Sequence, residues 1–244
     1  MADRGGNRVP GSLAWADRVG IMAGFGPLAG AHFYRRLIEL TPAGDDGEHV
    51  PVVLMTNPAT PSRLDHLHGD GPSPVPALVH LAQELARSGA TVLAIPSATV
   101  HAYYAEIQAA VGIPVLHLPQ VAMAAVRARG VKRLALLATT PTLALGLYRQ
   151  PAEEAGISVL VPDGATQDEV MTVITRVKAG GFPTEPAERL GALTARPWAA
   201  KADAFLLGCT ELPAVYPPAL RPAGTFDATD ELVRAVLRYV GRLP

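Results

Sequence analysis

The stretch Arg18-Val19-Gly20-Ile21-Met22-Ala23-Gly24-Phe25-Gly26-Pro27 has a counterpart later in the chain. The counterpart is Arg133-Leu134-Ala135-Leu136-Leu137-Ala138-Thr139-Thr140-Pro141-Thr142, which begins 115 residues after the first stretch. In both stretches a short apolar run ends in a turn-forming segment. Short apolar runs bounded by turn residues are typical of buried strands. The two stretches therefore predict two buried strands in equivalent places.

A second pair of segments repeats at nearly the same spacing. Residues 91–103 are similar to residues 203–216, because in each an apolar strand is followed by a small polar cluster. The clusters are Pro96-Ser97-Ala98-Thr99 and Gly208-Cys209-Thr210-Glu211, and Ser97 and Cys209 are 112 residues apart. Chance similarity between two strand–loop–helix units would explain either pair alone. Two pairs in the same order, at nearly the same offset, indicate an internal duplication.

Apolar runs alternate with helical patterns along the chain. The expected strands include 19–23, 50–55, 91–95 and 114–118, and the expected helices include 29–40, 75–88, 102–111, 168–178 and 230–242. Apolar strands alternating with amphipathic helices predict parallel sheets covered on both faces. We therefore predict an α/β protein with two doubly wound lobes. The predicted organisation is a mobile tail at 1–16, an N-terminal lobe formed by 17–118 plus 224–244, and a C-terminal lobe at 119–223.

The composition limits the classes of partner. Hydrophobic residues make up 49% of the 244 residues and charged residues 18%, which is typical of a globular protein. The formal net charge is −1 and no basic run is present, so neither nucleic acid nor an anionic membrane is expected as a partner. No apolar run is long enough to span a bilayer or to act as a signal core. We expect a cytoplasmic protein that binds a small molecule. The sequence leaves open whether the protein forms a homodimer.

The polar clusters follow the strands, where open parallel sheets bind their ligands. If the lobes face each other, Ser97 and Cys209 approach one ligand from opposite sides, which suits chemistry on two faces of one carbon. Cys209 is the only cysteine, so an internal disulfide is excluded. A lone cysteine is usually a small buried apolar residue. Cys209, however, lies where a strand gives way to a helix start, whose N–H groups can stabilise a thiolate.

Several polar residues near these clusters have both a functional and a structural interpretation. Glu211 is close enough to Cys209 to orient it or exchange a proton, or it is an acid in the first turn of a helix. Residues 24–27 lack the dinucleotide fingerprint and the Walker lysine, so they are either a turn whose N–H groups face a carboxylate or a plain turn. Asn57 and Arg63 lie in a proline-rich loop, and Arg63 is either a carboxylate-binding fork or a solvated surface residue. Lys178, at a helix end, interacts either with a ligand or with the helix dipole.

Five stretches together resemble the motifs of aspartate/glutamate racemases. They occur in the family's order, and the resemblance covers the chain from about Val19 to the C-terminal helix. Gly-Cys-Thr-Glu-Leu-Pro is the most specific of them. The stretches are 24–29, 57–63, 96–101, 167–178 and 208–213.

The resemblance implies two pseudo-symmetric, flavodoxin-like lobes with the active site between them and no cofactor. It also implies two facing cysteines, one removing the α-proton and the other delivering a proton to the opposite face. Cys209 matches the second-lobe cysteine, and Arg63 and Lys178 match positions that bind a substrate carboxylate. The expected catalytic residues are Cys209, Ser97 and Glu211. The expected substrate-binding residues are Gly24, Phe25, Gly26, Asn57, Arg63, Ala98, Thr99, Thr139, Lys178 and Thr210.

This chain departs from the family at the first motif. Ser97 stands where the first cysteine belongs, and Ala98 replaces an asparagine. A serine hydroxyl is a far weaker acid than a thiol and needs an adjacent base. His101 could supply that base, although we favour a structural, hydrogen-bonded histidine at a helix start.

Four functions fit these observations. The first is a racemase or epimerase with an asymmetric Ser97/Cys209 pair, which we favour narrowly. The second is a one-thiol decarboxylase or cis–trans isomerase, and the third is a lyase or cyclase of a biosynthetic pathway. The fourth is a ligand-binding protein without activity, against which the retained Cys209, Glu211, Arg63 and Lys178 count. No metal is expected, because the cysteine and the histidines lack ligand spacing.

Overall fold

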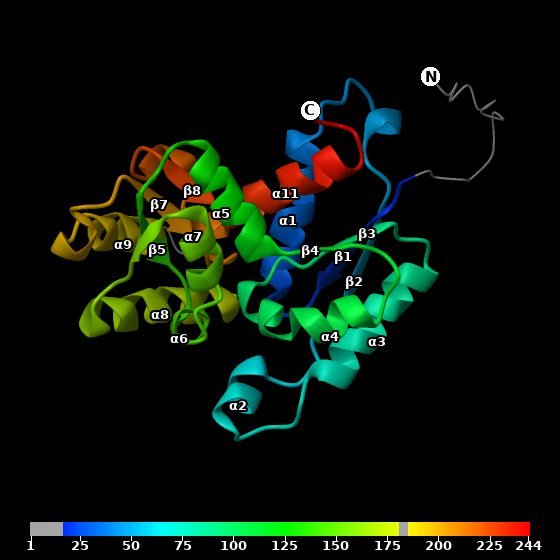
Figure 1. The fold of residues 1–244 in the computed structure, drawn as a ribbon, viewed down its shortest axis with the longest axis horizontal. Helices are drawn as coiled ribbons and strands as arrows, with labels where there is room; N and C mark the ends of the chain where they lie inside the picture. The colour runs from blue at the N-terminus through cyan, green and yellow to red at the C-terminus, as the bar shows by residue number, and fades with distance from the viewer. Residues whose placement is uncertain (1–16, 181–184) are drawn as a thin grey trace.

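The structure, a computed structural model, describes residues 17–180 and 185–244, so the predicted tail at 1–16 lies outside the described residues. Two four-stranded sheets, parallel throughout, form the two lobes seen in Figure 1. Their strand orders are β2-β1-β3-β4 and β6-β5-β7-β8. The strands are β1 (Val19–Ala23), β2 (Val52–Thr56), β3 (Val92–Ala94), β4 (Val115–Leu116), β5 (Arg133–Leu137), β6 (Ser158–Leu160), β7 (Ala204–Leu207) and β8 (Thr225–Asp227).

The two sheets have the same winding. In each, the first strand of the lobe lies between the second and the third; Ile21, for example, is in register with Leu54 on one side and Ala94 on the other. The predicted equivalences are present, because β1 corresponds to β5 and β3 corresponds to β7 in the two strand orders. The prediction of two doubly wound parallel lobes is confirmed.

The helices lie between the strands in sequence, and 3-10 turns are labelled η. The first lobe contains α1 (Pro27–Leu40), η1 (Asp46–Glu48), α2 (Arg63–His68), α3 (Val75–Arg87), η2 (Ala98–Tyr103) and α4 (Tyr104–Ala109). The rest of the chain contains α5 (Leu118–Ala128), α6 (Thr140–Ala144), α7 (Arg149–Ala155), α8 (Gly164–Lys178), α9 (Glu185–Thr194), η3 (Pro197–Ala199), α10 (Leu212–Val215), η4 (Pro218–Leu220) and α11 (Ala228–Tyr239). The helix predicted at 102–111 is thus a 3-10 turn followed by a shorter α-helix. No helix in the described ranges is long and apolar enough to cross a bilayer.

The alternation of side chains along β1 explains why both faces of the first sheet are covered. Ile21 packs in one apolar cluster with Phe33 of α1, whereas Met22 packs in another with Leu85 of α3. Successive residues of a strand point to opposite faces, so a fully apolar strand needs a cover on each. Figure 1 shows α1 and α11 on one side of this sheet and α3 and α4 on the other.

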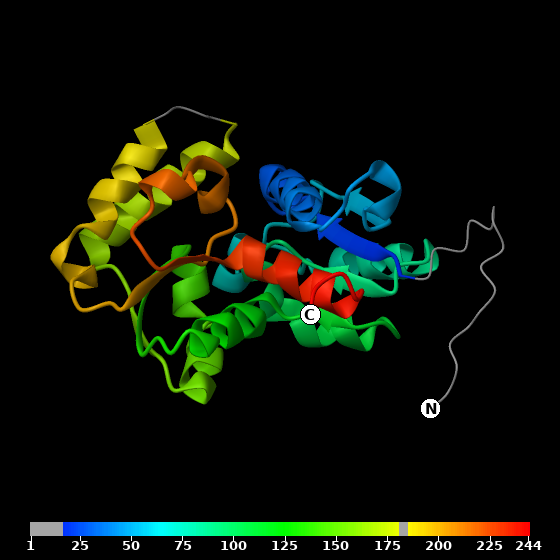
Figure 2. The same ribbon diagram turned by 90° about the horizontal axis from the view of Figure 1, so that it is seen from above.

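The chain returns to the first lobe at α11, which packs against α1 and α5 and reaches β3 and β4 (Figure 2). The sequence placed this return at residue 224. Instead β8 pairs with β7, so Thr225–Asp227 belongs to the second sheet. The crossing coincides with a helix cap, because the Asp227 carboxylate accepts hydrogen bonds from the backbone N–H groups of Thr229 and Asp230.

Candidate active site

Two side-chain hydrogen bonds join the lobes at the predicted polar clusters. The Thr210 hydroxyl donates to the Pro96 carbonyl at 3.0 Å, and the hydroxyls of Thr99 and Thr142 lie 3.2 Å apart. Thr210 follows Cys209, and Pro96 precedes Ser97. The structure therefore brings the two clusters to one seam between the lobes, at the carboxyl ends of β3 and β7.

Cys209 is buried at this seam, with 4% of its surface exposed. Its Sγ–H donates to Glu211 Oε2 at 3.0 Å. The strand end before it is held by Tyr148, whose hydroxyl donates to the Gly208 carbonyl at 2.9 Å. Burial, and then the charge of Glu211, raise the pKa of Cys209 well above its ordinary value, and Lys178 acts in the opposite direction. The resting group is a thiol.

This outcome corrects the expectation that a helix start lowers the pKa of Cys209. The helix that follows, α10, has only four residues. So short a helix has a small dipole, whereas removing a thiolate from water is costly. Desolvation and the neighbouring carboxylate outweigh the local N–H groups, so the pKa is raised.

The Glu211 carboxylate is shared by three groups rather than capping a helix. Glu211 is the N-cap residue of α10, but its side chain makes no cap hydrogen bond. Besides the contact with Cys209, its Oε1 lies 4.0 Å from Lys178 Nζ. The first lobe meets it at Gly26, where an added Cβ would lie 2.0 Å from Oε1. The buried pair Cys209 and Glu211 is therefore contacted by the more exposed Lys178 from its own lobe and by Gly26 from the first lobe.

The turn at residues 24–26 is held by Arg63 and lies close to the backbone of Asn57. Gly24 and Gly26 have φ values of +101° and +139°, which side chains rarely adopt, and a Cβ on Gly24 would lie 2.5 Å from the Asn57 backbone nitrogen. Arg63 begins α2 and donates from Nη2 to the Phe25 carbonyl at 2.9 Å, with its guanidinium 5.3 Å from the Phe25 ring centre. The Asn57 side chain accepts from the Ala59 N–H at 3.1 Å, within its own loop.

Arg63 is not a solvated surface residue. Burial lowers its pKa, and the negative charge of Glu211 opposes that shift. Its Nε is buried and has no hydrogen-bond partner among the described residues. A half-buried guanidinium with an unused N–H, near a carboxylate across the seam, can bind an incoming anion.

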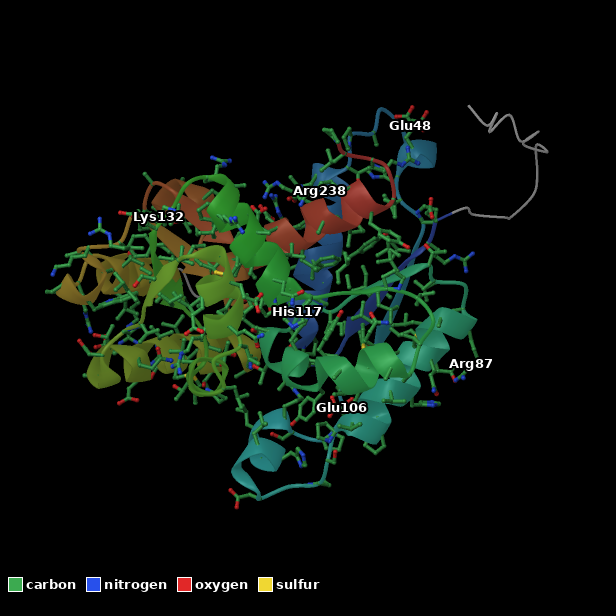
Figure 3. All side chains as sticks on the ribbon, viewed as in Figure 1. Glu48, Arg87, Glu106, His117, Lys132 and Arg238 are labelled. Carbon is green, nitrogen blue, oxygen red and sulfur yellow. The ribbon has the colours of Figure 1, made fainter. Side chains whose placement is uncertain are left out.

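Ser97 lies on the first-lobe side of the seam with 8% of its surface exposed, and Ala98 beside it is also buried. His101 does not serve Ser97 as a base, because its Nδ1 lies 2.9 Å from the Ser97 carbonyl and its Nε2 accepts from the Leu118 N–H at 3.1 Å. Burial, followed by His117 (Figure 3), whose ring centre is 5.1 Å away, lowers the pKa of His101 to about 4. Both ring nitrogens of His101 are hydrogen-bonded to backbone groups, so the structural interpretation of this histidine fits.

Four polar residues at or next to the seam were not singled out from the sequence. The hydroxyl of Thr142 lies 2.8 Å from that of Thr139, which is the N-cap residue of α6. Thr142 follows Thr139 by three residues, which is a capping spacing, so the sequence carried a signal for this contact. Gln167 donates to the Ala138 carbonyl at 3.0 Å. The others, Tyr103 and Tyr148, lie in helical or loop segments where the sequence carries no signal.

In the part of the chain that the structure describes, no three His, Cys, Asp or Glu side chains gather as metal ligands.

The sequence profile of the family described as Asp/Glu/Hydantoin racemase matches residues 22–236. The chain belongs to this racemase family.

Two relatives support this assignment. The broad specificity amino-acid racemase RacX of Bacillus subtilis is 27% identical over 201 residues, which are 81% of this chain and 86% of that protein. The structure of the Picrophilus torridus aspartate racemase superposes with a TM-score of 0.84 at 27% identity, covering 92% of this chain and 94% of that one. The glutamate racemase of Francisella tularensis, at 14% identity and a TM-score of 0.62 over 93% and 83% of the chains, shares the fold. Membership of the racemase family supports a racemase-like, isomerase function.

Proposed function

We propose that this racemase-family chain is a cofactor-independent amino-acid racemase or epimerase, with Cys209 as its main acid/base. The observation that carries the proposal is the buried thiol 3.0 Å from the Glu211 carboxylate, at the seam between two lobes. RacX and the aspartate racemase, by their names, act on amino acids, which supports a small amino acid as the substrate.

Arg63 and Lys178 are proposed to bind the substrate carboxylate. They come from different lobes, at the start of α2 and the end of α8, and both interact with Glu211. Backbone N–H groups at residues 24–26 are proposed to donate further hydrogen bonds to the same carboxylate. Two cations around one buried carboxylate leave a net positive site for an anion.

The proton transfer begins with Glu211. Its carboxylate takes the Sγ proton, and the resulting thiolate removes the proton from the α-carbon, leaving the bonding pair as a carbanion beside the substrate carboxylate. Returning the proton from Sγ to the same face regenerates the substrate. Inversion requires a proton on the other face, where Ser97 is the nearest counterpart of Cys209. The Ser97 alkoxide then regains a proton from solvent while Glu211 releases the proton it took, so that every group returns to its starting state. Since His101 is occupied, delivery from Ser97 should be the slow step.

The raised pKa of Cys209 also favours a second candidate. A protonated thiol is ready to donate rather than to accept a proton. A decarboxylase or cis–trans isomerase that protonates a carbanion or enediolate on one face needs only that donor. Such an enzyme has no use for a second thiol at Ser97.

Exchange in deuterated water separates the two candidates. The protein, dialysed and assayed without pyridoxal phosphate, is incubated with L- and D-aspartate, L- and D-glutamate and other small amino acids, and α-deuteration and stereochemistry are followed. A racemase yields deuterated product of both configurations, whereas a one-sided enzyme yields exchange with retained configuration. Absence of exchange with every amino acid, while Cys209→Ala behaves identically, would contradict the proposal.

A further inference from the structure

A cavity of about 350 Å³ lies between the lobes, separate from the buried Cys209 group. Its walls come from α1 of the first lobe, from the segment 213–221 of the second, and from the start of α11. Figure 2 shows α1 and α11 meeting in this region. A volume of this size is within the range of small-molecule sites.

One wall carries a polar group without a partner. His32 of α1 is 6% exposed, and its Nδ1 accepts a hydrogen bond from Arg35 Nη2 at 3.2 Å. Since arginine can only donate, the ring proton of neutral His32 is on Nε2. That Nε2 is buried and has no hydrogen-bond partner among the described residues. Burial, and then Arg35, lower the pKa of His32 to about 4, so the ring stays a neutral donor.

The three arginines that line the cavity differ in how closely their charges are paired with carboxylates. Arg36 is bound by Asp230 through two hydrogen bonds of 2.6 and 2.8 Å, and Arg221 pairs with Asp227 at 3.2 Å. Among the described residues, Arg35 forms an ion pair of 3.6 Å with Glu39 besides its contact with His32, and its side chain is 62% exposed. Two of the three positive charges are thus paired with aspartates that line the same cavity, whereas Arg35 is paired only with Glu39 in an exposed ion pair, which contributes little in water and can be exchanged for an acid group of a ligand.

Another part of the lining is apolar. It is formed by a run of small and cyclic side chains around α10, namely Pro213, Ala214, Val215, Pro217 and Pro218. A ligand that fills this cavity therefore needs a singly charged acid group at the α1 side and an apolar body against the prolines. We propose that the cavity binds a small monocarboxylic acid with an aromatic or branched aliphatic body, held through Arg35 and the free N–H of His32.

Isothermal titration of the full chain with benzoate, benzamide and inorganic phosphate tests this proposal. Benzoate has both features, benzamide lacks the charge, and phosphate lacks the apolar body. Benzoate should bind at least about tenfold more tightly than either control. Equal or tighter binding of phosphate or benzamide, or failure of benzoate to bind at millimolar concentration, overturns the proposal.

Variants separate this cavity from the carboxylate-binding residues near Cys209. Arg35→Gln removes the available charge from an exposed side chain and should weaken benzoate binding about tenfold, whereas Arg35→Lys should keep most of it. Ala214→Trp should fill the cavity and abolish binding. Arg63→Gln, at the other site, should leave this binding unchanged. Benzoate binding that is unaffected by Arg35→Gln, or lost in Arg63→Gln, would refute the assignment, whatever reaction the enzyme catalyses.

Discussion

Replacing Gly26 by alanine should separate catalysis from folding. The added Cβ would lie 2.0 Å from Glu211 Oε1, far inside van der Waals contact, so the carboxylate must move away from Cys209 and Lys178. The φ of +139° adds backbone strain of about 1–3 kcal/mol. Acid/base groups typically contribute about 10²–10⁴-fold, so displacing Glu211 should lower kcat by about 10²-fold or more.

Gly130→Ala is the matched control. Gly130 also has a positive φ, +74°, but a Cβ there would meet no atom within 4 Å, so this variant carries strain without a clash. Urea denaturation should show that both variants fold, with Gly130→Ala losing about 1 kcal/mol of unfolding free energy. The assay is the rate of α-proton exchange. A folded Gly26→Ala variant with kcat within about twofold of the parent, or an equal loss in Gly130→Ala, would refute the role of Glu211.

The other predictions concern the reacting groups, acid stability and chelation. Cys209→Ala should abolish turnover and Ser97→Ala should be milder, as measured by kcat on the true substrate; full activity of Cys209→Ala would make the thiol structural. Ser97→Cys should restore the family's pair and raise racemisation of an acidic amino acid, measured by optical rotation, unless Ala98 prevents its binding. The pKa of His101 falls from 6.5 to about 4 on folding. As the pH is lowered, the unfolded chain therefore binds a proton at this histidine before the folded chain does. The contribution of His101 to the free energy of unfolding is lost between those two pH values. His101→Asn should therefore show a shallower loss of stability than the parent between pH 6.5 and about 4 in urea titrations, and an equal slope would count against a buried neutral ring. Turnover should survive EDTA, since the cysteine and histidines lack metal-ligand spacing; loss restored by a divalent cation would contradict this.

The sheet topology could be predicted because its signals are local. The run Val19–Ala23 is apolar at each position except Gly20, as a strand buried on both faces must be, and it forms β1 with the same bounds. The position of Ser97 and Cys209 at one seam followed from a general rule for ligand sites in parallel sheets. The nearness of Glu211 to Cys209 followed from a separation of two residues.

The remaining features depend on contacts that local sequence does not encode. The pKa of Cys209 is governed by burial between two lobes, which no neighbouring residue reveals. The short strand Thr225–Asp227 is recognisable only by its pairing with β7, so the return to the first lobe was placed too early. Thr142 lies far from Thr99 in sequence, and the hydroxyl contact between them exists only once the lobes meet.

The crossing of α11 has a consequence for biosynthesis. This helix buries Leu232, Val233, Val236 and Leu237 against α1 and α5, yet it is translated after the whole second lobe. While a nascent chain is still on the ribosome, one face of the N-terminal sheet thus lacks part of its cover. Exposed apolar surface of that kind invites aggregation. The first lobe can therefore begin to fold early but cannot complete its packing until translation has passed Tyr239, so chaperones that shield nascent chains should improve the yield of folded protein.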